Sequence, residues 1–295
     1  MRAVVLGAGG QLGFELTAEL RKRGVHVLAV TRRQLDITEP SAVEALFHRH
    51  QPDWVLNAAA YNLVDKAERE PELAYRVNAL GVRNIAVAAS GVGATLVHYS
   101  TDHVFDGEKQ TPYEEEDLPS PPSAYGISKL AGEYYAHAYC DKRFVIRVAG
   151  VFGPAGQFTN RSNFPELVLR KARAKEPLRV VEDFFATPTY AVPLAARSVD
   201  LLEKAPFGLY HLGGGETVSW YQYALKILEA AQLEADIQPT NHREYVTPAR
   251  RPRHSSLSNK KIEELGLPPM PTLDEALADY LHRRDTVRSA IETKA

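Results

Sequence analysis

The sequence is almost without cysteine. Its 295 residues contain a single one, Cys140, which excludes an internal disulfide and a cysteine-based zinc cluster. Such sparse use of cysteine indicates a reduced compartment, so the cytoplasm is the expected location. The acidic run at 114–117 is interpreted as a solvated loop, because consecutive carboxylates do not converge on one ion, and no metal site is predicted.

Long hydrophobic runs and an excess of one charge are also missing. No apolar stretch approaches the ~20 residues that a membrane helix needs, and the opening residues lack the cleavage region of a signal peptide. The 35 Lys and Arg residues nearly balance the 37 Asp and Glu residues. Nucleic acid and membrane are therefore not expected partners.

The first half of the chain alternates short β-branched segments with longer helical patterns, which is typical of a parallel sheet covered by helices. Strands are expected at 3–6, 25–30, 54–57, 95–100 and 144–148. Between the first two, Leu12, Leu16 and Leu20 share one helix face, and Gly24 is placed to end that helix. We predict an α/β fold with a Rossmann-type doubly wound parallel sheet.

The regular alternation fades after residue 148, where prolines become frequent and two longer helical patterns remain, at 220–231 and 272–290. We predict a dinucleotide-binding domain at 1–148 and, at 149–295, mainly a smaller mixed α/β substrate-binding lobe. Segments near 186–206 and 249–256 are expected to return to the first domain. The aromatic residues at 220–223 are interpreted as helix packing.

A glycine-rich loop follows the first expected strand and opens the first helix. Gly7, Gly10 and Gly13 stand at the spacing that permits a tight turn, close approach of a pyrophosphate, and close packing of helix on sheet. The helix N-terminus then offers free N–H groups to the phosphates. A bound dinucleotide is the prediction.

The end of the second expected strand bears on which dinucleotide binds. An acid that reads both ribose hydroxyls of NAD normally stands there, but the chain reads Thr31, Arg32 and Arg33. Guanidinium groups suit the 2′-phosphate of NADPH. NADPH is therefore the predicted cofactor, with NADH as the alternative.

A tyrosine and a lysine stand one helical turn apart at Tyr125 and Lys129. An ammonium stabilises phenolate and so lowers the pKa of a neighbouring tyrosine toward the working pH, which lets the phenol exchange a proton with a carbonyl oxygen. The spacing alone is common by chance. The preceding strand, however, ends at Thr101, and the carboxyl ends of strands border the ligand crevice of such a sheet.

Glycine loop, strand-end hydroxyl and Tyr-xxx-Lys, in that order, resemble the extended short-chain dehydrogenase/reductases. Five further stretches, spread over most of the chain, are similar to signatures of the dTDP-4-dehydrorhamnose reductase family: 57–61 (NAAAY), 64–68 (VDKAE), 100–105 (STDHVF), 187–190 (TPTY) and 251–255 (RPRHS). The resemblance implies reduction of the 4-keto group of a nucleotide-activated 6-deoxyhexose. Its expected product is dTDP-rhamnose.

The resemblance also implies roles for particular residues. Tyr125 would donate the proton, Lys129 would lower its pKa and bind the ribose, and Thr101 would polarise the keto oxygen. Motif and resemblance together predict a cofactor cleft of Gly7, Gly10, Gln11, Leu12, Gly13, Thr31, Arg32, Asp36, Ile37, Ala58, Ala59, Ala60, Tyr61, Ser100, Tyr125 and Lys129. The expected substrate residues are Thr101, Asp102, Thr189 and Arg251, with Arg170, Lys171 and Arg173 as further candidates for the diphosphate.

Three positions depart from the family pattern. Gly150 replaces a tryptophan that would line the sugar pocket, His103 replaces a tyrosine, and Thr31 replaces the acid that commonly ends the second strand. The first change leaves the identity of the sugar open, and the last bears on the cofactor.

Other functions share these motifs. A dehydratase is disfavoured because Asp102 is followed by His103 and not by a second acid. Another sugar-nucleotide reductase, an epimerase, or a non-catalytic regulatory or binding subunit of the same fold stays open as an alternative. The expected partners are a nucleotide sugar and, as a candidate assembly, a second copy in a homodimer.

Overall fold

A six-stranded sheet forms the centre of the first lobe in the computed structural model, which describes residues 1–157 and 163–292. In spatial order its strands are β2 (His26–Val30), β1 (Arg2–Leu6), β3 (Trp54–Asn57), β4 (Thr95–Thr101), β5 (Arg143–Val148) and β8 (Gly208–His211). All neighbouring strands are parallel. The predicted doubly wound sheet is confirmed, and β8 adds a strand that its sequence, without β-branched residues, does not indicate.

The strand order reverses beside β1, because the chain first adds β2 on one side and then crosses to place β3 on the other. Loops leaving the carboxyl ends of β1 and β3 diverge there, which opens the crevice in which such sheets bind ligands. The glycine loop follows β1 and the residues 58–61 follow β3. Two stretches predicted to contact the cofactor therefore meet at this point.

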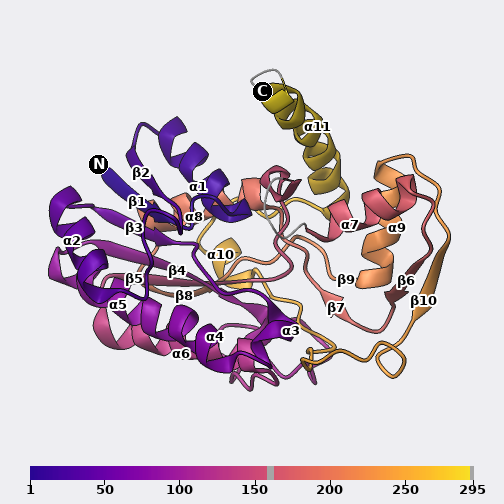
Figure 1. The fold of residues 1–295 in the computed structure, drawn as a ribbon, viewed down its shortest axis with the longest axis horizontal. Helices are drawn as coiled ribbons and strands as arrows, with labels where there is room; N and C mark the ends of the chain where they lie inside the picture. Colours follow the sequence, from indigo (N-terminus) through magenta and orange to yellow (C-terminus); the bar gives the residue numbers. More distant parts are fainter. Residues whose placement is uncertain (158–162, 293–295) are drawn as a thin grey trace.

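Helices cover both faces of the sheet (Figure 1). Helices α1 (Gln11–Lys22) and α8 (Ala191–Lys204) pack on one face, and α2 (Pro40–His50), α5 (Gly81–Gly91) and α6 (Ala124–Tyr139) cover the other. Leu12, Leu16 and Leu20 are buried in the first of these layers, as their spacing predicts. The short helix α10 (Lys260–Glu264) lies beside β8 and buries Ile262 there.

Short helical segments lie along the carboxyl edge of the sheet and connect the longer elements. They are α3 (Val64–Ala67), α4 (Pro71–Tyr75), the π-helix η1 (Arg76–Leu80), and the 3₁₀ segments η2 (Asp102–Val104) and η3 (Pro154–Gln157). Within residues 1–157 and 163–292, every helix is too short or too polar to cross a bilayer.

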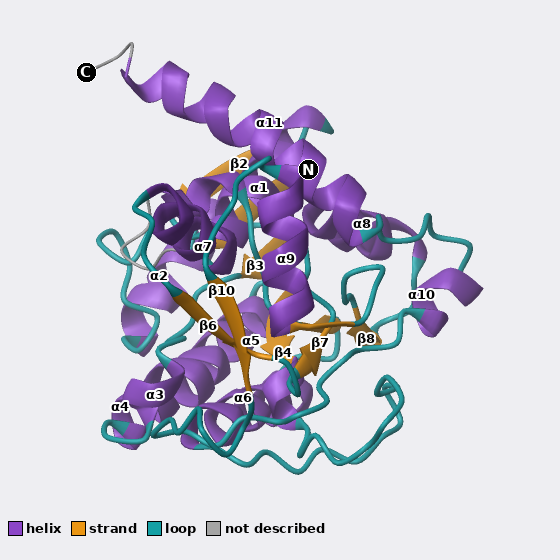
Figure 2. Ribbon diagram, turned by 90° about the vertical axis from the view of Figure 1, so that its right-hand side faces the viewer, coloured by secondary structure: helices purple, strands orange, loops and turns teal. Residues whose placement is uncertain are grey.

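The second lobe surrounds an aromatic core made by Phe152, Tyr190, Tyr223 and Tyr280. Its elements are α7 (Phe164–Arg173), β6 (Leu178–Val181), β7 (Phe185–Ala186), β9 (Val218–Ser219), α9 (Trp220–Ala230), β10 (Ile237–Thr240) and α11 (Leu273–Glu292). β6 pairs with β10 in parallel, beside α9 (Figure 2). β7 pairs with β9 antiparallel. The aromatic residues at 220–223 pack in the core of this lobe from α9, as the sequence predicts.

The chain passes between the lobes more than once. α8 and β8 lie in the first lobe although they follow residue 148. The segment 252–258 is bonded to β7 on one side, through the Ser255 nitrogen and the Phe185 oxygen at 2.9 Å, and to the loop at Tyr113 on the other. The domain boundary at 148 stays a prediction.

Candidate active site

Two glycines of the loop after β1 lie so close to neighbouring backbone that a side chain would not fit. Gly7 has a φ of +75°, and a β-carbon there would lie 2.6 Å from the Ala59 nitrogen. At Gly13 a β-carbon would lie 2.2 Å from the Gly7 oxygen, so α1 can pack this closely only without one. The loop therefore sits directly against the residues that follow β3.

Helix α1 begins in this loop with its positive end open. Gly10 is the N-cap, no side chain in the described part of the chain caps the helix, and its first turn holds no acidic residue. The first N–H groups of a helix carry partial positive charge and lack intrahelical acceptors. Together with the glycine turn, this arrangement fits the pyrophosphate of a dinucleotide.

The loop 58–61 is held by a residue that the sequence analysis missed, Asn78 of η1. Its side-chain amide accepts from the Tyr61 nitrogen and donates to the Tyr61 oxygen, both at 2.8 Å, and also donates to the Ser128 hydroxyl of α6. The Tyr61 phenol donates to Glu70 at 3.2 Å. A π-helical turn inside a longer helix often marks a functional position. The sequence does not reveal this turn, because a single asparagine in an apolar helical stretch does not distinguish it from an ordinary α-helix.

Beyond β2, the loop predicted to lie at the adenosine end is ordered by its own polar contacts. Gln34 accepts from both the nitrogen and the hydroxyl of Thr31, at 2.8 Å each. The Asp36 carboxylate accepts from the Thr38 nitrogen and hydroxyl, and these bonds, with the nearby charge of Arg32, lower the pKa of Asp36. The side chain of Arg32 is exposed at the surface.

The same loop is anchored by Ile37. Its side chain is buried against Gly81, and its carbonyl oxygen accepts from the Asn84 amide at 3.1 Å. Ile37 therefore fixes the position of the loop from beneath.

Tyr125 reaches the carboxyl edge of the sheet because the N-terminus of α6 packs closely on η2. The Ser123 hydroxyl caps α6 by accepting from the Gly126 nitrogen at 3.2 Å, as its sequence position predicts. A β-carbon at Gly126 would lie 2.3 Å from the His103 oxygen. The close approach places the half-buried Tyr125 ring edge-on to the His103 ring, with centroids 5.5 Å apart.

Lys129 lies one turn further along α6 and is fully enclosed. Its ammonium donates to the Tyr99 carbonyl of β4 at 2.5 Å. Burial lowers the pKa of Lys129 to about 8, while the charge of Glu133 acts in the opposite direction. The cation is thus held in a dry position next to the end of β4.

Thr101 ends β4 opposite Val148 of β5. Its hydroxyl donates to Asp102 Oδ1 at 3.0 Å and accepts from the His103 nitrogen at 3.2 Å. The second carboxylate oxygen of Asp102 accepts from the hydroxyl of Ser255 at 2.6 Å. Ser255 belongs to the RPRHS stretch, in which the family resemblance implies a role for Arg251 alone.

A buried polar network lies beneath these residues. The Ser100 hydroxyl donates to Glu133, and Glu133 forms a two-bond ion pair with Arg147, at 2.8 and 2.9 Å. The Arg147 guanidinium also lies over the Phe105 ring, 5.0 Å from its centroid. The side chain of Ser100, predicted to bind the cofactor, is therefore engaged with Glu133.

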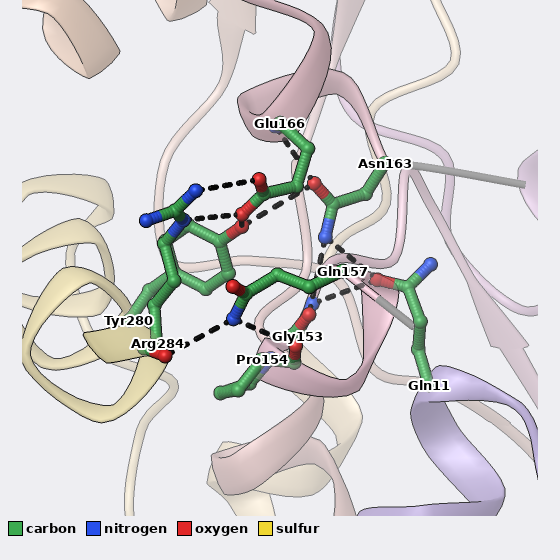
Figure 3. A network of polar contacts seen from close by, with 8 residues as sticks. All are labelled: Gln11, Gly153, Pro154, Gln157, Asn163, Glu166, Tyr280 and Arg284. Atoms are coloured by element: carbon green, nitrogen blue, oxygen red, sulfur yellow. Dashed lines mark hydrogen bonds and ion pairs between the residues drawn. The ribbon is translucent and has the colours of Figure 1, made fainter. Parts of the chain in front are cut away.

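Gln11 and Leu12, also predicted in the cofactor cleft, direct their side chains elsewhere. Leu12 is buried in the core. The Gln11 side-chain oxygen accepts from the Gly153 nitrogen at 3.0 Å and from the Asn163 amide at 2.8 Å, which joins α1 to the second lobe (Figure 3). Gln11 and Leu12 lie in the first turn of α1, where their backbone N–H groups face the crevice.

Of the basic residues predicted for the diphosphate, only Arg170 and Arg173 border the same cavity. Arg170 and Arg173 line a cavity of about 520 Å³ between α7, η3 and α11, bordered also by Gln157, Glu166, Ala174 and Arg284. Lys171 donates to the Pro177 oxygen at 3.3 Å. Arg251 instead forms a two-bond ion pair with Asp65 of α3, at 2.8 and 2.9 Å.

Two positions of the predicted sugar pocket lie just beyond β5. Thr189 is buried, and its hydroxyl donates to the Thr187 oxygen at 2.9 Å. Gly150 has a φ of +49°, and a β-carbon there would lie 3.6 Å from Pro188 and 3.7 Å from the ring of Trp220. The indole of Trp220 therefore borders the space next to Gly150.

One interpretation of the sequence is wrong. The acidic run at 114–117 is not simply solvated, because Glu115 accepts from the His211 nitrogen at 2.7 Å, and its partial burial raises its pKa. In the described part of the chain, no three His, Cys, Asp or Glu residues gather in a way that could hold a metal ion.

Comparison with known proteins shows which sequences this chain is similar to. The sequence profile of the family described as RmlD substrate binding domain matches residues 1–286. The spore coat polysaccharide biosynthesis protein SpsK of Bacillus subtilis is 38% identical over 285 residues, which cover 97% of this chain and 98% of the relative. The dTDP-4-dehydrorhamnose reductase of Escherichia coli is 37% identical, with 90% of this chain and 91% of the relative covered.

Among solved structures, the dTDP-4-dehydrorhamnose reductase of Bacillus anthracis in complex with NADP superposes with a TM-score of 0.91. It is 33% identical, and the match covers 96% of this chain and 99% of that one. The fold and the sequence therefore agree along nearly the whole length.

Proposed function

This chain belongs to the family of the RmlD substrate binding domain, and from that membership and its site we propose that it is an NADPH-dependent sugar-nucleotide 4-ketoreductase. The proposed reaction reduces the keto group of a nucleotide-activated 6-deoxyhexose, with dTDP-4-dehydrorhamnose as substrate and dTDP-rhamnose as product. One observation carries the proposal: Thr101, Tyr125 and Lys129 stand at the carboxyl edge of a sheet whose glycine loop fits a dinucleotide.

The glycine loop and the N-terminus of α1 would hold the pyrophosphate, with the backbone N–H groups of Gln11, Leu12 and Gly13 facing it. The loop 58–61 and the residues Thr31, Arg32, Asp36 and Ile37 would border the rest of the dinucleotide. When bound, the reduced nicotinamide supplies the hydride for the keto carbon.

Tyr125 is proposed to deliver the proton to the keto oxygen from its phenol. The ammonium of Lys129, one helical turn away, favours the phenolate that this transfer leaves behind. Its bond to the Tyr99 carbonyl keeps the charge in place. The residues thus supply proton transfer and charge stabilisation at the carbon that is reduced.

Thr101 is proposed to meet the same keto oxygen with its hydroxyl. In the structure its single hydrogen goes to Asp102, while its oxygen is held by the His103 nitrogen. Donation to the substrate therefore requires the hydroxyl to turn away from Asp102. A placed donor of this kind typically contributes ~2.7–4 kcal/mol to the transition state.

Gly150 bears on which sugar the site accepts. Asp102, Thr189 and Arg251 are proposed to face the sugar nucleotide, but the position that would carry a tryptophan is Gly150. SpsK of Bacillus subtilis, which is 38% identical, is named for spore coat polysaccharide biosynthesis. A related 4-keto sugar nucleotide is the second candidate substrate.

A panel of 4-keto sugar nucleotides, assayed with NADPH and NADH by absorbance at about 340 nm, the nicotinamide band that is lost on oxidation, tests the proposal. We expect turnover with dTDP-4-dehydrorhamnose or a close analogue. Binding of NADPH and sugar nucleotide without any turnover would contradict the proposal and support the regulatory or binding subunit instead. Localisation in the cytoplasm and assembly as a homodimer stay predictions.

The cofactor preference has its own test at Arg32. Its guanidinium is exposed in the loop after β2, where a bidentate contact with a 2′-phosphate would favour NADPH by about tenfold to a hundredfold. We expect Arg32→Ala to erase most of the difference in kcat/KM between NADPH and NADH while sparing activity with NADH. Equal losses with both cofactors would show that Arg32 does not read the 2′-phosphate.

A further inference from the structure

We propose that Ser255 is a positioning residue of the active site, which acts on Thr101 through the carboxylate of Asp102. The inference rests on the proposed function and extends it to a residue 153 positions away from Asp102 in the sequence. Ser255 donates to Asp102 Oδ2 at 2.6 Å, and Thr101 donates to Oδ1 of the same carboxylate at 3.0 Å. One carboxylate therefore links the two hydroxyls.

Backbone hydrogen bonds on both sides of the segment hold Ser255, and they fix the position of its hydroxyl. The Ser255 nitrogen donates to the Phe185 oxygen of β7 at 2.9 Å, and the Ser256 oxygen accepts from the Tyr113 nitrogen at 2.8 Å. A β-carbon at Gly107 would lie 2.4 Å from the Arg253 nitrogen, which shows how closely this segment is held. Ser255 thus lies in an extended segment that is hydrogen-bonded to β7, and its hydroxyl points to Asp102.

Asp102 depends on these two hydroxyls because it is buried without a cation. Its side chain is 5% exposed, and among the described residues the structure shows no Lys, Arg or His in an ion pair with it. A buried carboxylate that loses its donors is costly, since it has given up its hydration. Each of the two hydroxyl bonds is therefore important to the carboxylate.

This dependence makes Ser255 relevant to catalysis. If Thr101 turns its hydrogen to the keto oxygen, Asp102 loses that bond and keeps only the one from Ser255. The Ser255 bond lowers the cost of the turn and also prevents the carboxylate from rotating. Without it, Thr101 would stay bonded to Asp102, and the donor to the substrate would be lost.

The adjacent residue offers a matched control. Ser255 and Ser256 are each 4% exposed, but the hydroxyl of Ser256 has no hydrogen-bond partner among the described residues. Alanine at either position removes the same atom from the same buried segment. Only Ser255→Ala also removes a bond to Asp102.

The experiment compares Ser255→Ala with Ser256→Ala in the full chain, by kcat and KM for the sugar nucleotide and by NADPH binding. We expect Ser255→Ala to lower kcat about tenfold, the value of one hydrogen bond to a charged group, with NADPH affinity unchanged. Ser256→Ala should stay within about twofold of the parent. Should the alanine variant not fold, Ser255→Cys, similar in size but a weak donor, gives the same readout.

Measuring Ser255→Ala in a Thr101→Val background separates an effect on the Thr101 hydroxyl from an effect on folding. If Ser255 acts through the Thr101 hydroxyl, Ser255→Ala should cost less than about twofold in kcat once that hydroxyl is absent. Equal kcat values for the two serine variants, or an undiminished tenfold loss in the Thr101→Val background, would overturn the inference. An unmodified chain that reduces no keto sugar nucleotide would contradict the proposed function itself, and the inference with it.

Discussion

At the residue scale, the proposed chemistry depends on one cation in a dry position. Lys129 is enclosed between α6 and β4, bonded to a backbone carbonyl, and burial brings its pKa down to about 8. It is therefore charged at neutral pH and loses its proton as the pH rises through about 8. Any contribution of this charge to catalysis is present below that pH and disappears above it.

The pH dependence of the reduction follows from this. With NADPH saturating, kcat/KM for the sugar nucleotide should fall as the pH is raised through about 8. Lys129→Met should lower activity at every pH and remove this limb of the profile, because no ammonium remains to titrate. A limb that persists in the methionine variant would assign it to another group.

Tyr125 carries the second prediction at this scale. Tyr125→Phe keeps the ring that packs edge-on to His103 and removes only the phenolic hydroxyl. Turnover should fall by roughly 10²–10⁴, the usual contribution of a general acid, while NADPH binding measured by fluorescence changes little. A variant with most of its activity left would mean that another group donates the proton.

At the scale of elements, the glycine loop and α1 form the part of the site most sensitive to volume. A β-carbon at Gly13 would meet the backbone of Gly7 at 2.2 Å, so Gly13→Ala must move the helix or the loop. We expect the free energy of unfolding, measured with urea, to fall by about 1–3 kcal/mol and NADPH affinity to fall with it.

Gly91 is the matched control for that change. It also lies in a helix, at the end of α5, but a β-carbon there would meet nothing within 4 Å. Gly91→Ala should be neutral or stabilising by about 0.5–1 kcal/mol, because alanine loses less backbone entropy on folding. Equal effects of the two substitutions would show that close packing at Gly13 is not what the loop requires.

Elements with local signals could be predicted from the sequence, and contacts between distant segments could not. The five β-branched strands, the leucine face of α1 and the Ser123 cap each depend on neighbours a few residues away. β8 has no such pattern, and it pairs only because β5 offers an edge. Asn78 and Ser255 are likewise functional candidates only through partners 17 and 153 residues distant.

At the scale of the whole molecule, side-chain contacts of three described residues join the lobes around the crevice. Gln11 reaches Gly153 and Asn163, Arg251 pairs with Asp65, and Ser255 bonds Asp102. Each joins a segment of the first lobe that stands at the carboxyl edge to a segment that follows residue 148. The proposed catalytic residues thus lie in one lobe, while the second lobe helps to orient them.

The most direct test of this account is the fate of the hydride. NADPH that carries deuterium at both C4 positions of the nicotinamide is incubated with the enzyme and dTDP-4-dehydrorhamnose, and the product sugar is examined by mass spectrometry and NMR. The expected product carries one deuterium, bound at C4 of the sugar, and it forms rapidly with the parent and slowly with Tyr125→Phe. Unchanged NADPH, or a product sugar whose C4 carries no deuterium, would contradict it.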